Sequence, residues 1–329
     1  MSSPAVGVHR IAVPTPWMGT VNAYLLEGDP LTLVDTGPGL TASTALLADG
    51  LRVLGHRIED VELIVLTHQH FDHVGAADVL RARSGASVAA FGPSVAFLGA
   101  YPVAAGREDD WVADLMRRHG ASAGTVAGAR SFAAFEAHLA SPVVVDLPLD
   151  DGDELRAGGR ALRVLHRPGH SPSDIVLLDP RDGLLLAGDH LLGRVTSNAL
   201  LALPLDADGP IDPTAGHGAP LIDYRRSLRR TRQLPASLVL GGHDEPFDDH
   251  VALIDERLVG HERRAERLLS RLGGDPRSAF SLAVAHWGPV AEDQPFLVLS
   301  EVLGHLDLLV DAGTVSVVHA GDAVLFARA

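Results

Sequence analysis

The chain has 329 residues, of which 46% are hydrophobic, and a formal net charge of −15 at pH 7. It contains no cysteine, and all 27 of its basic residues are arginine. This composition excludes disulfides, thiolate nucleophiles, cysteine-ligated zinc and any mechanism that needs a lysine. The negative charge makes nucleic acid an unlikely partner. No segment approaches the roughly 20 apolar residues that cross a bilayer, and no secretion signal is recognisable, so we expect a cytoplasmic protein.

Residues 11–91 predict alternating strands and helices. The run 62–66 is short and almost wholly apolar, as expected of a strand that is buried on both faces. Thr41 follows the turn Asp35-Thr36-Gly37-Pro38-Gly39 and is placed to cap a helix. The expected strands are 21–26, 31–34, 62–66 and 87–91, and the expected helices are 41–54 and 74–83.

Residues 93–142 predict a helical insertion, with helices around 109–119 and 130–139. Such an insertion is either a lid over a site or additional scaffold packing, and the sequence does not decide between them. Residues 193–221 are rich in Gly, Pro and Asp and predict a long loop. Further strands are expected at 143–147, 161–166, 174–178, 184–187 and 237–240, and a helix at 222–234.

The last part of the chain predicts a long helix at 248–272 and then a small unit of two helices, 277–287 and 296–312, and a hairpin, 314–318 and 323–327. The order helix, helix, hairpin is typical of a winged helix. Counting from Asp255, the tail has 7 Arg against 11 Asp and Glu. A winged helix that reads DNA should be basic, so we interpret this unit as packing, dimer-forming or substrate-capping.

The motif His68-x-His70-x-Asp72-His73 directly follows the apolar run at 62–66. In an extended loop, residues two positions apart point the same way, so His68 and His70 can bind one ion. Asp72 and His73 lie where the chain turns into a helix and can face a second ion. His170, Asp189 and His243 each follow a predicted strand with glycine nearby, which lets the backbone bend toward an ion. We therefore predict a metal site built from these seven residues.

These residues resemble the metallo-β-lactamase-fold hydrolase superfamily over about residues 8–250. The resemblance implies an αββα sandwich, with a catalytic domain over 1–255 and a winged-helix C-terminal unit over 256–329. It implies that His68, His70 and His170 bind one ion, that Asp72, His73 and His243 bind the other, and that Asp189 bridges them. Asp35, in the turn Asp35-Thr36-Gly37, would orient ligands through hydrogen bonds. The two divalent ions would be zinc, with manganese or iron as alternatives.

The absence of cysteine, of a flavodoxin-like domain and of a basic arm favours the glyoxalase II-like branch of this superfamily. We therefore predict a hydrolase that attacks a thioester, ester or lactone carbonyl with a metal-bridging hydroxide, in which Asp72 is catalytic. One departure is that Val74-Gly75-Ala76 has a single glycine where that branch has two. A metal-dependent ribonuclease, a β-lactam hydrolase and a non-catalytic binding module remain as alternatives.

Other residues are weaker candidates for roles around the site. His190 follows Asp189 and could support the ligands from outside. Tyr224, with Arg225 and Arg226, could contact the substrate or the outer layer of the site. For partners, we expect a small-molecule acyl substrate, with no nucleic acid and no membrane, and a homodimer is compatible with the tail.

Overall fold

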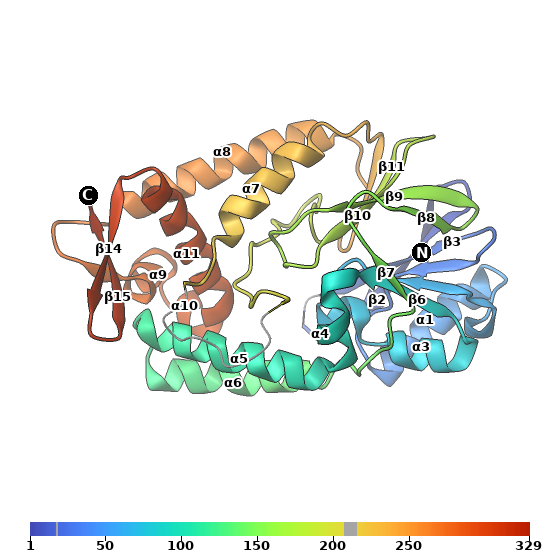
Figure 1. Cartoon of the computed structure of the whole chain (residues 1–329), viewed down its shortest axis with the longest axis horizontal. Helices are drawn as coiled ribbons and strands as arrows, with labels where there is room; N and C mark the ends of the chain where they lie inside the picture. Colours follow the sequence, from blue (N-terminus) through green and yellow to red (C-terminus); the bar gives the residue numbers. More distant parts are fainter. Residues whose placement is uncertain (18, 207–215) are drawn as a thin grey trace.

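The computed structural model describes residues 1–17, 19–206 and 216–329. Two β-sheets lie face to face, and helices cover the outer face of each sheet, so the main body has four layers (Figure 1). This is the αββα sandwich that the sequence predicts. Among the described residues, no helix combines the length and the apolar character that spanning a membrane requires.

The first sheet has seven strands that lie side by side in chain order. Neighbouring strands are antiparallel up to the fourth strand and parallel from there on. The sequence predicts the third to the sixth of these strands, but not the first two, and its expected strand 143–147 shares only Leu147 with the seventh. The strands are β1 (Ser2–Ala5), β2 (Val8–Pro14), β3 (Thr20–Leu26), β4 (Thr32–Val34), β5 (Leu63–Val65), β6 (Ser87–Phe91) and β7 (Leu147–Leu149).

The second sheet has five strands, in the order β12-β11-β10-β9-β8. Only β11 and β12 are parallel, and the other neighbours are antiparallel. Four of the five strands match the sequence prediction to within one or two residues. The strands are β8 (Glu154–Ala157), β9 (Arg160–His166), β10 (Ile175–Asp179), β11 (Leu184–Gly188) and β12 (Leu238–Gly241).

Alternate side chains of the central strands enter different cores. In β5, Leu63 and Val65 face the apolar layer between the sheets, whereas Ile64 faces the core under the outer helices. In β10, Leu177 faces the layer between the sheets and Val176 faces the opposite side. Both faces of these strands are therefore buried, which explains their nearly continuous apolar sequences.

The helices of the first half differ in two details from the sequence prediction. Thr41 is the first residue of its helix and not the cap, because the extended residue before the helix is Leu40, which makes no side-chain capping bond. The helix predicted at 74–83 is split into two, with a break at Gly75 and Ala76. The helices are α1 (Thr41–Val53), α2 (Phe71–Val74) and α3 (Ala77–Ser84), with a 3-10 turn at Ile58–Asp60.

The insertion is helical, as predicted, and its two main helices are longer than the sequence indicates. Its helices are α4 (Val95–Gly99), α5 (Tyr101–Arg118) and α6 (Ala123–Ala137), after a 3-10 turn at Gly92–Ser94. The strand predicted at 143–147 is wrong, because Val143 lies buried under α4, where its N–H donates to the carbonyl of Leu98 at 3.0 Å. The pair α5 and α6 extends from the sandwich to the C-terminal end of the molecule (Figure 1).

The second half continues with α7 (Pro220–Thr231) and α8 (His250–Leu269). The predicted loop contains no helix or strand over 193–206 and 216–219, and its remaining residues 207–215 lie outside the described ones. α8 runs without a break through the domain boundary predicted at 255/256. That boundary therefore stays a prediction.

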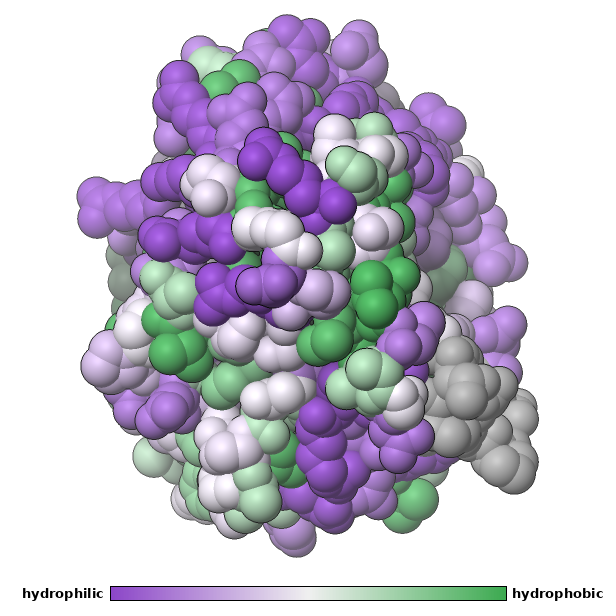
Figure 2. Space-filling model, turned by 90° about the vertical axis from the view of Figure 1, so that its left-hand side faces the viewer, coloured by the Kyte–Doolittle hydropathy of each residue, from purple (hydrophilic) through white to green (hydrophobic). Residues whose placement is uncertain are grey.

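The C-terminal unit contains three helices and a three-stranded antiparallel sheet of order β13-β15-β14. A winged helix stays a prediction for this unit. On the end of the molecule that it forms, hydrophilic and hydrophobic residues are interspersed (Figure 2). Its elements are β13 (Arg277–Ser278), α9 (Ala279–Trp287), α10 (Val290–Asp293), α11 (Pro295–Asp311), β14 (Val315–Ala320) and β15 (Ala323–Arg328).

Gly75 marks a close approach of three backbone segments. A Cβ atom at this position would lie 2.3 Å from both the Gly39 nitrogen and the Leu139 oxygen. Gly39 itself donates its N–H to the Leu139 carbonyl at 2.6 Å. The turn after β4, the helix α2 and the chain that follows α6 thus meet at Gly75, just after the metal-binding motif.

We expect Gly75→Ala to destabilise the protein by about 1–3 kcal/mol, because none of the three backbone segments can move aside cheaply. Gly128→Ala in α6 is the matched control, since nothing lies within 4 Å of its Cβ position. That change should stabilise the protein by about 0.5–1 kcal/mol through helix propensity. Urea unfolding followed by circular dichroism measures both effects. Equal stability of the two variants would contradict the close approach at Gly75.

Candidate metal centre

The seven side chains that the sequence singles out as metal ligands converge at one edge of the sandwich. Each lies beyond the C-terminal end of a strand, or in the short helix that follows one. His68 and His70 belong to the loop after β5, Asp72 and His73 belong to α2, and His170, Asp189 and His243 follow β9, β11 and β12. This placement brings residues from distant parts of the chain into one cluster of potential donors.

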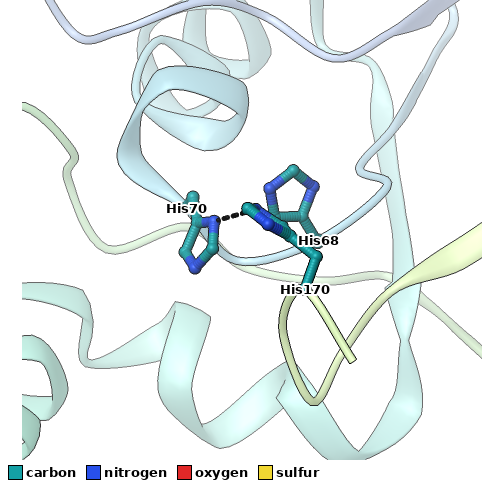
Figure 3. A group of neighbouring side chains, drawn as sticks. All are labelled: His68, His70 and His170. Atoms are coloured by element: carbon teal, nitrogen blue, oxygen red, sulfur yellow. Dashed lines mark hydrogen bonds between the residues drawn. The ribbon is translucent and has the colours of Figure 1, made fainter. Parts of the chain in front are cut away.

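Three histidines form the first group of donors. One ring nitrogen from each of His68, His70 and His170 lies within 4.8 Å of the others. Nε2 of His170 is 2.9 Å from Nδ1 of His70, and the two rings reach this point from different loops (Figure 3). Three imidazoles that converge in this way are a suitable donor set for zinc and similar divalent ions.

Asp72, His73 and His243 form a second group whose donor atoms also lie within 4.8 Å of one another. The Oδ2 atom of Asp72 is 3.6 Å from Nε2 of His73 and 3.4 Å from Nε2 of His243. These separations exceed a normal hydrogen bond. Such distances are typical of donor atoms that surround one bound ion, and are too long for atoms that hydrogen-bond to each other.

Asp189 lies between the two groups. Its Oδ1 atom is 3.4 Å from Nε2 of His73, and its Oδ2 atom is 3.2 Å from Nε2 of His243 and 3.6 Å from Nε2 of His170. Gly242 permits this arrangement, because a Cβ atom there would lie 2.2 Å from Oδ1 of Asp189. The carboxylate therefore contacts both groups at once.

Several donor atoms of the cluster are buried without a hydrogen-bond partner. They are Nε2 of His68, Nε2 of His73 and Oδ1 of Asp189. A buried polar atom that lacks a partner costs roughly 1–3 kcal/mol, so three of them at one point require an explanation. A bound cation supplies one, since all three atoms can donate an electron pair to it. The cluster is thus compatible with divalent metal binding.

Burial keeps two histidines of the first group, His68 and His70, in their neutral form. It lowers the pKa of His70 to about 3 and the pKa of His68 well below its usual value, and neighbouring histidines add to both effects. Neutral imidazole is the form that binds a metal.

In the second group, the pKa values of the histidines shift in the opposite direction, because carboxylates surround them. Burial would lower the pKa of His243, but the Asp189 and Asp72 carboxylates outweigh it and raise that pKa to about 11. The same carboxylates, together with Asp35, hold the pKa of His73 well above its usual value against the effect of burial. A field that retains protons on these imidazoles equally attracts a metal cation.

Asp35 orients the motif from behind. Its Oδ1 accepts the N–H of Thr67 at 2.9 Å, and its Oδ2 is 2.8 Å from both the Thr67 hydroxyl and Nδ1 of His73. This contact directs Nε2 of His73 toward the cluster. Asp35 adopts a φ of 59°, a conformation uncommon outside glycine. Through these contacts Asp35 can orient His73, and its role in supporting metal ligands stays a prediction.

Two further ligand rings, those of His170 and His243, are also held through their second nitrogen. Nδ1 of His170 donates to the carbonyl of Asn198 at 2.9 Å, and Nδ1 of His243 donates to the carbonyl of Thr20 at 2.7 Å. Hydrogen bonds of this kind fix the ring orientation and the tautomer of a ligand. They direct Nε2 of each ring toward the other donors of the cluster.

Tyr224 is not placed to touch a substrate. Its side chain is buried, and its hydroxyl donates to the carbonyl of His190 at 2.8 Å. The His190 ring is also buried and lies 2.8 Å from the Thr231 hydroxyl. Arg225 is buried and donates to Glu262, whereas Arg226 pairs with Asp223 at the surface. Tyr224 and His190 therefore support the segment that carries Asp189 from outside the cluster.

Sequence reasoning missed several residues around the site. Asp244 follows His243 with a φ of 63° and fixes this loop, because its side chain accepts the N–H groups of Arg194 and Val195. Glu136 in α6 interacts with Asp72, and burial raises its pKa to about 7. No local pattern marks either residue, since each acts through a segment that is distant in sequence.

The comparisons with known proteins agree with this geometry. Residues 17–243 match the family model described as the metallo-beta-lactamase superfamily. A probable metallo-hydrolase of Bacillus subtilis, YqjP, is 31% identical to this chain over 97% of both proteins. A hydroxyacylglutathione hydrolase of Cereibacter sphaeroides is 29% identical over 48% of this chain and 46% of its own.

A solved structure extends the similarity to the whole chain. The metallo-beta-lactamase family protein TTHA1429 of Thermus thermophilus shares 31% identity and a TM-score of 0.79, over 99% of both chains. With the family match, the full-length relative and the architecture in agreement, the chain is a member of the metallo-β-lactamase superfamily and a metallo-hydrolase.

Proposed function

We propose that this protein hydrolyses a thioester, ester or lactone with two divalent metal ions, for which zinc fits the donors best. The observation that carries the proposal is the position of Asp189. Its two carboxylate oxygens contact histidines of both donor groups, at 3.2 to 3.6 Å. A carboxylate that is shared in this way is suited to bridge two ions, and seven donors exceed what one tetrahedral ion uses.

In this proposal His68, His70 and His170 hold one ion, and Asp72, His73 and His243 hold the other. When bound, such a pair of ions lowers the pKa of water to about 7 and polarises the carbonyl oxygen that gains charge. The chain supplies the positions of the reacting groups. Asp35, Asn198 and Thr20 fix three of the ligand rings through their Nδ1 atoms.

Asp72 is the proposed proton acceptor. Its carboxylate belongs to the second donor group, and burial tends to raise its pKa, while His73 and His243 lower it below the usual value. The group is therefore ionised near neutral pH and can accept a hydrogen bond from the attacking nucleophile. It can then pass the proton toward the leaving group, as general acid–base catalysis requires.

The surroundings of the site favour an uncharged acyl substrate over a polyanion. Asp72 and three acids of the insertion (Glu108, Asp109 and Glu136) all interact electrostatically with the buried Tyr101. Burial raises the pKa of Glu108 and Glu136 to about 7, so the negative charge at neutral pH comes mainly from Asp72, whose pKa is lowered, and from Asp109, whose pKa is about 6. These two negative groups on this side of the site disfavour phosphates. The relative from Cereibacter sphaeroides is named for hydrolysis of an acyl group on glutathione, which is in keeping with an acyl substrate.

A panel of acyl thioesters, lactones, nitrocefin and short RNA, assayed with zinc-reconstituted protein, tests the reaction. We expect turnover of carbonyl substrates that a chelator abolishes and added zinc restores, since the attacking water depends on the ions. If only the RNA were cleaved, the proposal would be wrong and the alternative function, a metal-dependent ribonuclease, would replace it. Hydrolysis of nitrocefin alone would assign the protein to β-lactams.

We expect Asp72→Ala to lower kcat for the substrate found in that panel by about 10²–10⁴-fold, because it removes both a ligand and the proton acceptor. Circular dichroism should show an unchanged fold. Asp49→Ala, at an exposed site of α1, is the control and should retain full activity. If Asp72→Ala kept more than about a tenth of the wild-type rate, the proposed role of Asp72 would be wrong.

We expect wild-type protein to bind about two zinc ions per chain, and Asp35→Asn to weaken zinc binding by about 10–100-fold. An amide at this position presents N–H groups toward Thr67 and His73, which themselves donate to Asp35. Competition with a chelating dye measures the affinity, and elemental analysis measures the stoichiometry. Occupancy that stays near one ion, or an unchanged affinity in the variant, would contradict this account.

A further inference from the structure

We propose that an aromatic cluster formed by Trp17, Phe71, Phe132 and Phe135 binds the apolar acyl chain of the substrate. This inference rests on the proposed function and names its substrate class. Trp17 lies at the centre of the cluster. Its ring centroid is 5.0 Å from that of Phe132, 5.4 Å from that of Phe135 and 6.1 Å from that of Phe71.

The exposure of these rings sets them apart from the rest of the molecule. The exposed fraction is 38% for Trp17, 48% for Phe132 and 51% for Phe135. Within the described part of the chain, they are the only aromatic residues among the exposed large hydrophobic ones. Scattered exposed apolar residues are ordinary, but exposed aromatic rings gathered at one place mark a binding surface.

The cluster is continuous with the metal centre. Phe71 lies in the motif between His70 and Asp72 and begins α2. Unlike the other three rings, it is buried, with 9% of its surface exposed. The cluster therefore leads from solvent to the helix that carries Asp72 and His73. An acyl group whose carbonyl reacts at the metal centre could extend its chain along these rings.

The rings are held in place before any ligand binds. The Trp17 side chain makes a hydrogen bond with the carboxyl group of Glu136, which neighbours Phe135 in α6. The end of α6 is fixed to the turn after β4, because the Leu139 carbonyl accepts the N–H of Gly39 at 2.6 Å. Rigid aromatic surfaces bind apolar groups well, since little side-chain freedom is lost on binding.

The acidic residues near the cluster favour an uncharged alkyl or aryl chain over other ligands that bind aromatic surfaces. A nucleobase can also stack on such rings. Its phosphates, however, would be repelled by the carboxylates of Asp72 and Asp109, both of which interact with Glu136 of the cluster's own anchor. An uncharged hydrocarbon chain brings no such repulsion.

The test uses neutral N-acetylcysteamine thioesters with acyl chains from two to ten carbons, and thioethers of the same lengths that cannot be hydrolysed. In wild-type protein, kcat/KM for the thioesters and the affinity for the thioethers should rise about fourfold for each of the first methylenes. In the double variant Phe132→Ala/Phe135→Ala, this dependence on chain length should largely disappear.

Val103→Ala is the matched control, because this residue is 76% exposed and lies in the same insertion, on α5. It should keep the wild-type dependence on chain length. Thermal unfolding should show that all variants are folded, as expected for changes at exposed positions.

The outcomes separate this inference from the proposed function. Thioethers that bind with chain-length dependence, while no thioester is hydrolysed, would overturn the proposed reaction but retain the apolar site. No dependence in wild-type protein, or the same dependence in the double variant, would overturn the inference. It would also be overturned if sedimentation showed that the double variant only breaks a dimer, because the cluster would then be a protein contact.

Discussion

The buried carboxylate of Asp35 is the contact on which the geometry of the metal centre depends. It accepts hydrogen bonds from the Thr67 backbone, the Thr67 hydroxyl and His73, and so joins the turn after β4 to the motif after β5. The same turn is held at two more points, since Thr36 donates to the His73 carbonyl and Ala76 donates to that of Gly37. Because β4 and β5 are parallel neighbours, both segments leave the sheet at the same edge. The pairing of β4 with β5 therefore determines where the ligands of the motif lie.

Electrostatics gives the two donor groups different characters. The first group consists of imidazoles alone, and burial keeps His68 and His70 neutral. In the second group, Asp72 and Asp189 raise the pKa values of His73 and His243 above their usual value. Without an ion, protons therefore occupy these imidazoles at neutral pH, and a metal must displace them. Metal binding at the second group should consequently weaken more steeply as the pH falls.

The sequence predicts those parts of the fold and site that local patterns encode. The strand β5 and the motif after it could be predicted because a short apolar run ends in four closely spaced donors. β8 escaped prediction because it has only four residues, which is too short a run to stand out, although polar and apolar residues alternate along it. Val143 has a strand-like sequence context, yet its burial under α4 decides its conformation. The pair Trp17 and Glu136 could not be predicted from the sequence, since the hydrogen bond between their side chains depends on how α6 packs.

The helical insertion provides scaffold packing, one of the two roles between which the sequence does not decide, and the other role, a lid, stays a prediction. Along α5, Trp111, Leu115 and Met116 pack with helices α9 and α11 in one apolar core, which is scaffold packing. At the other end, α6 is fixed to Gly39 through Leu139 and places Phe132 and Phe135 beside Trp17. The C-terminal unit buries one side of the insertion, and the opposite end of that insertion forms a rim of the metal centre. The C-terminal unit can therefore affect the site through packing, because it shares an apolar core with the helices of the insertion, one of which carries Phe132 and Phe135.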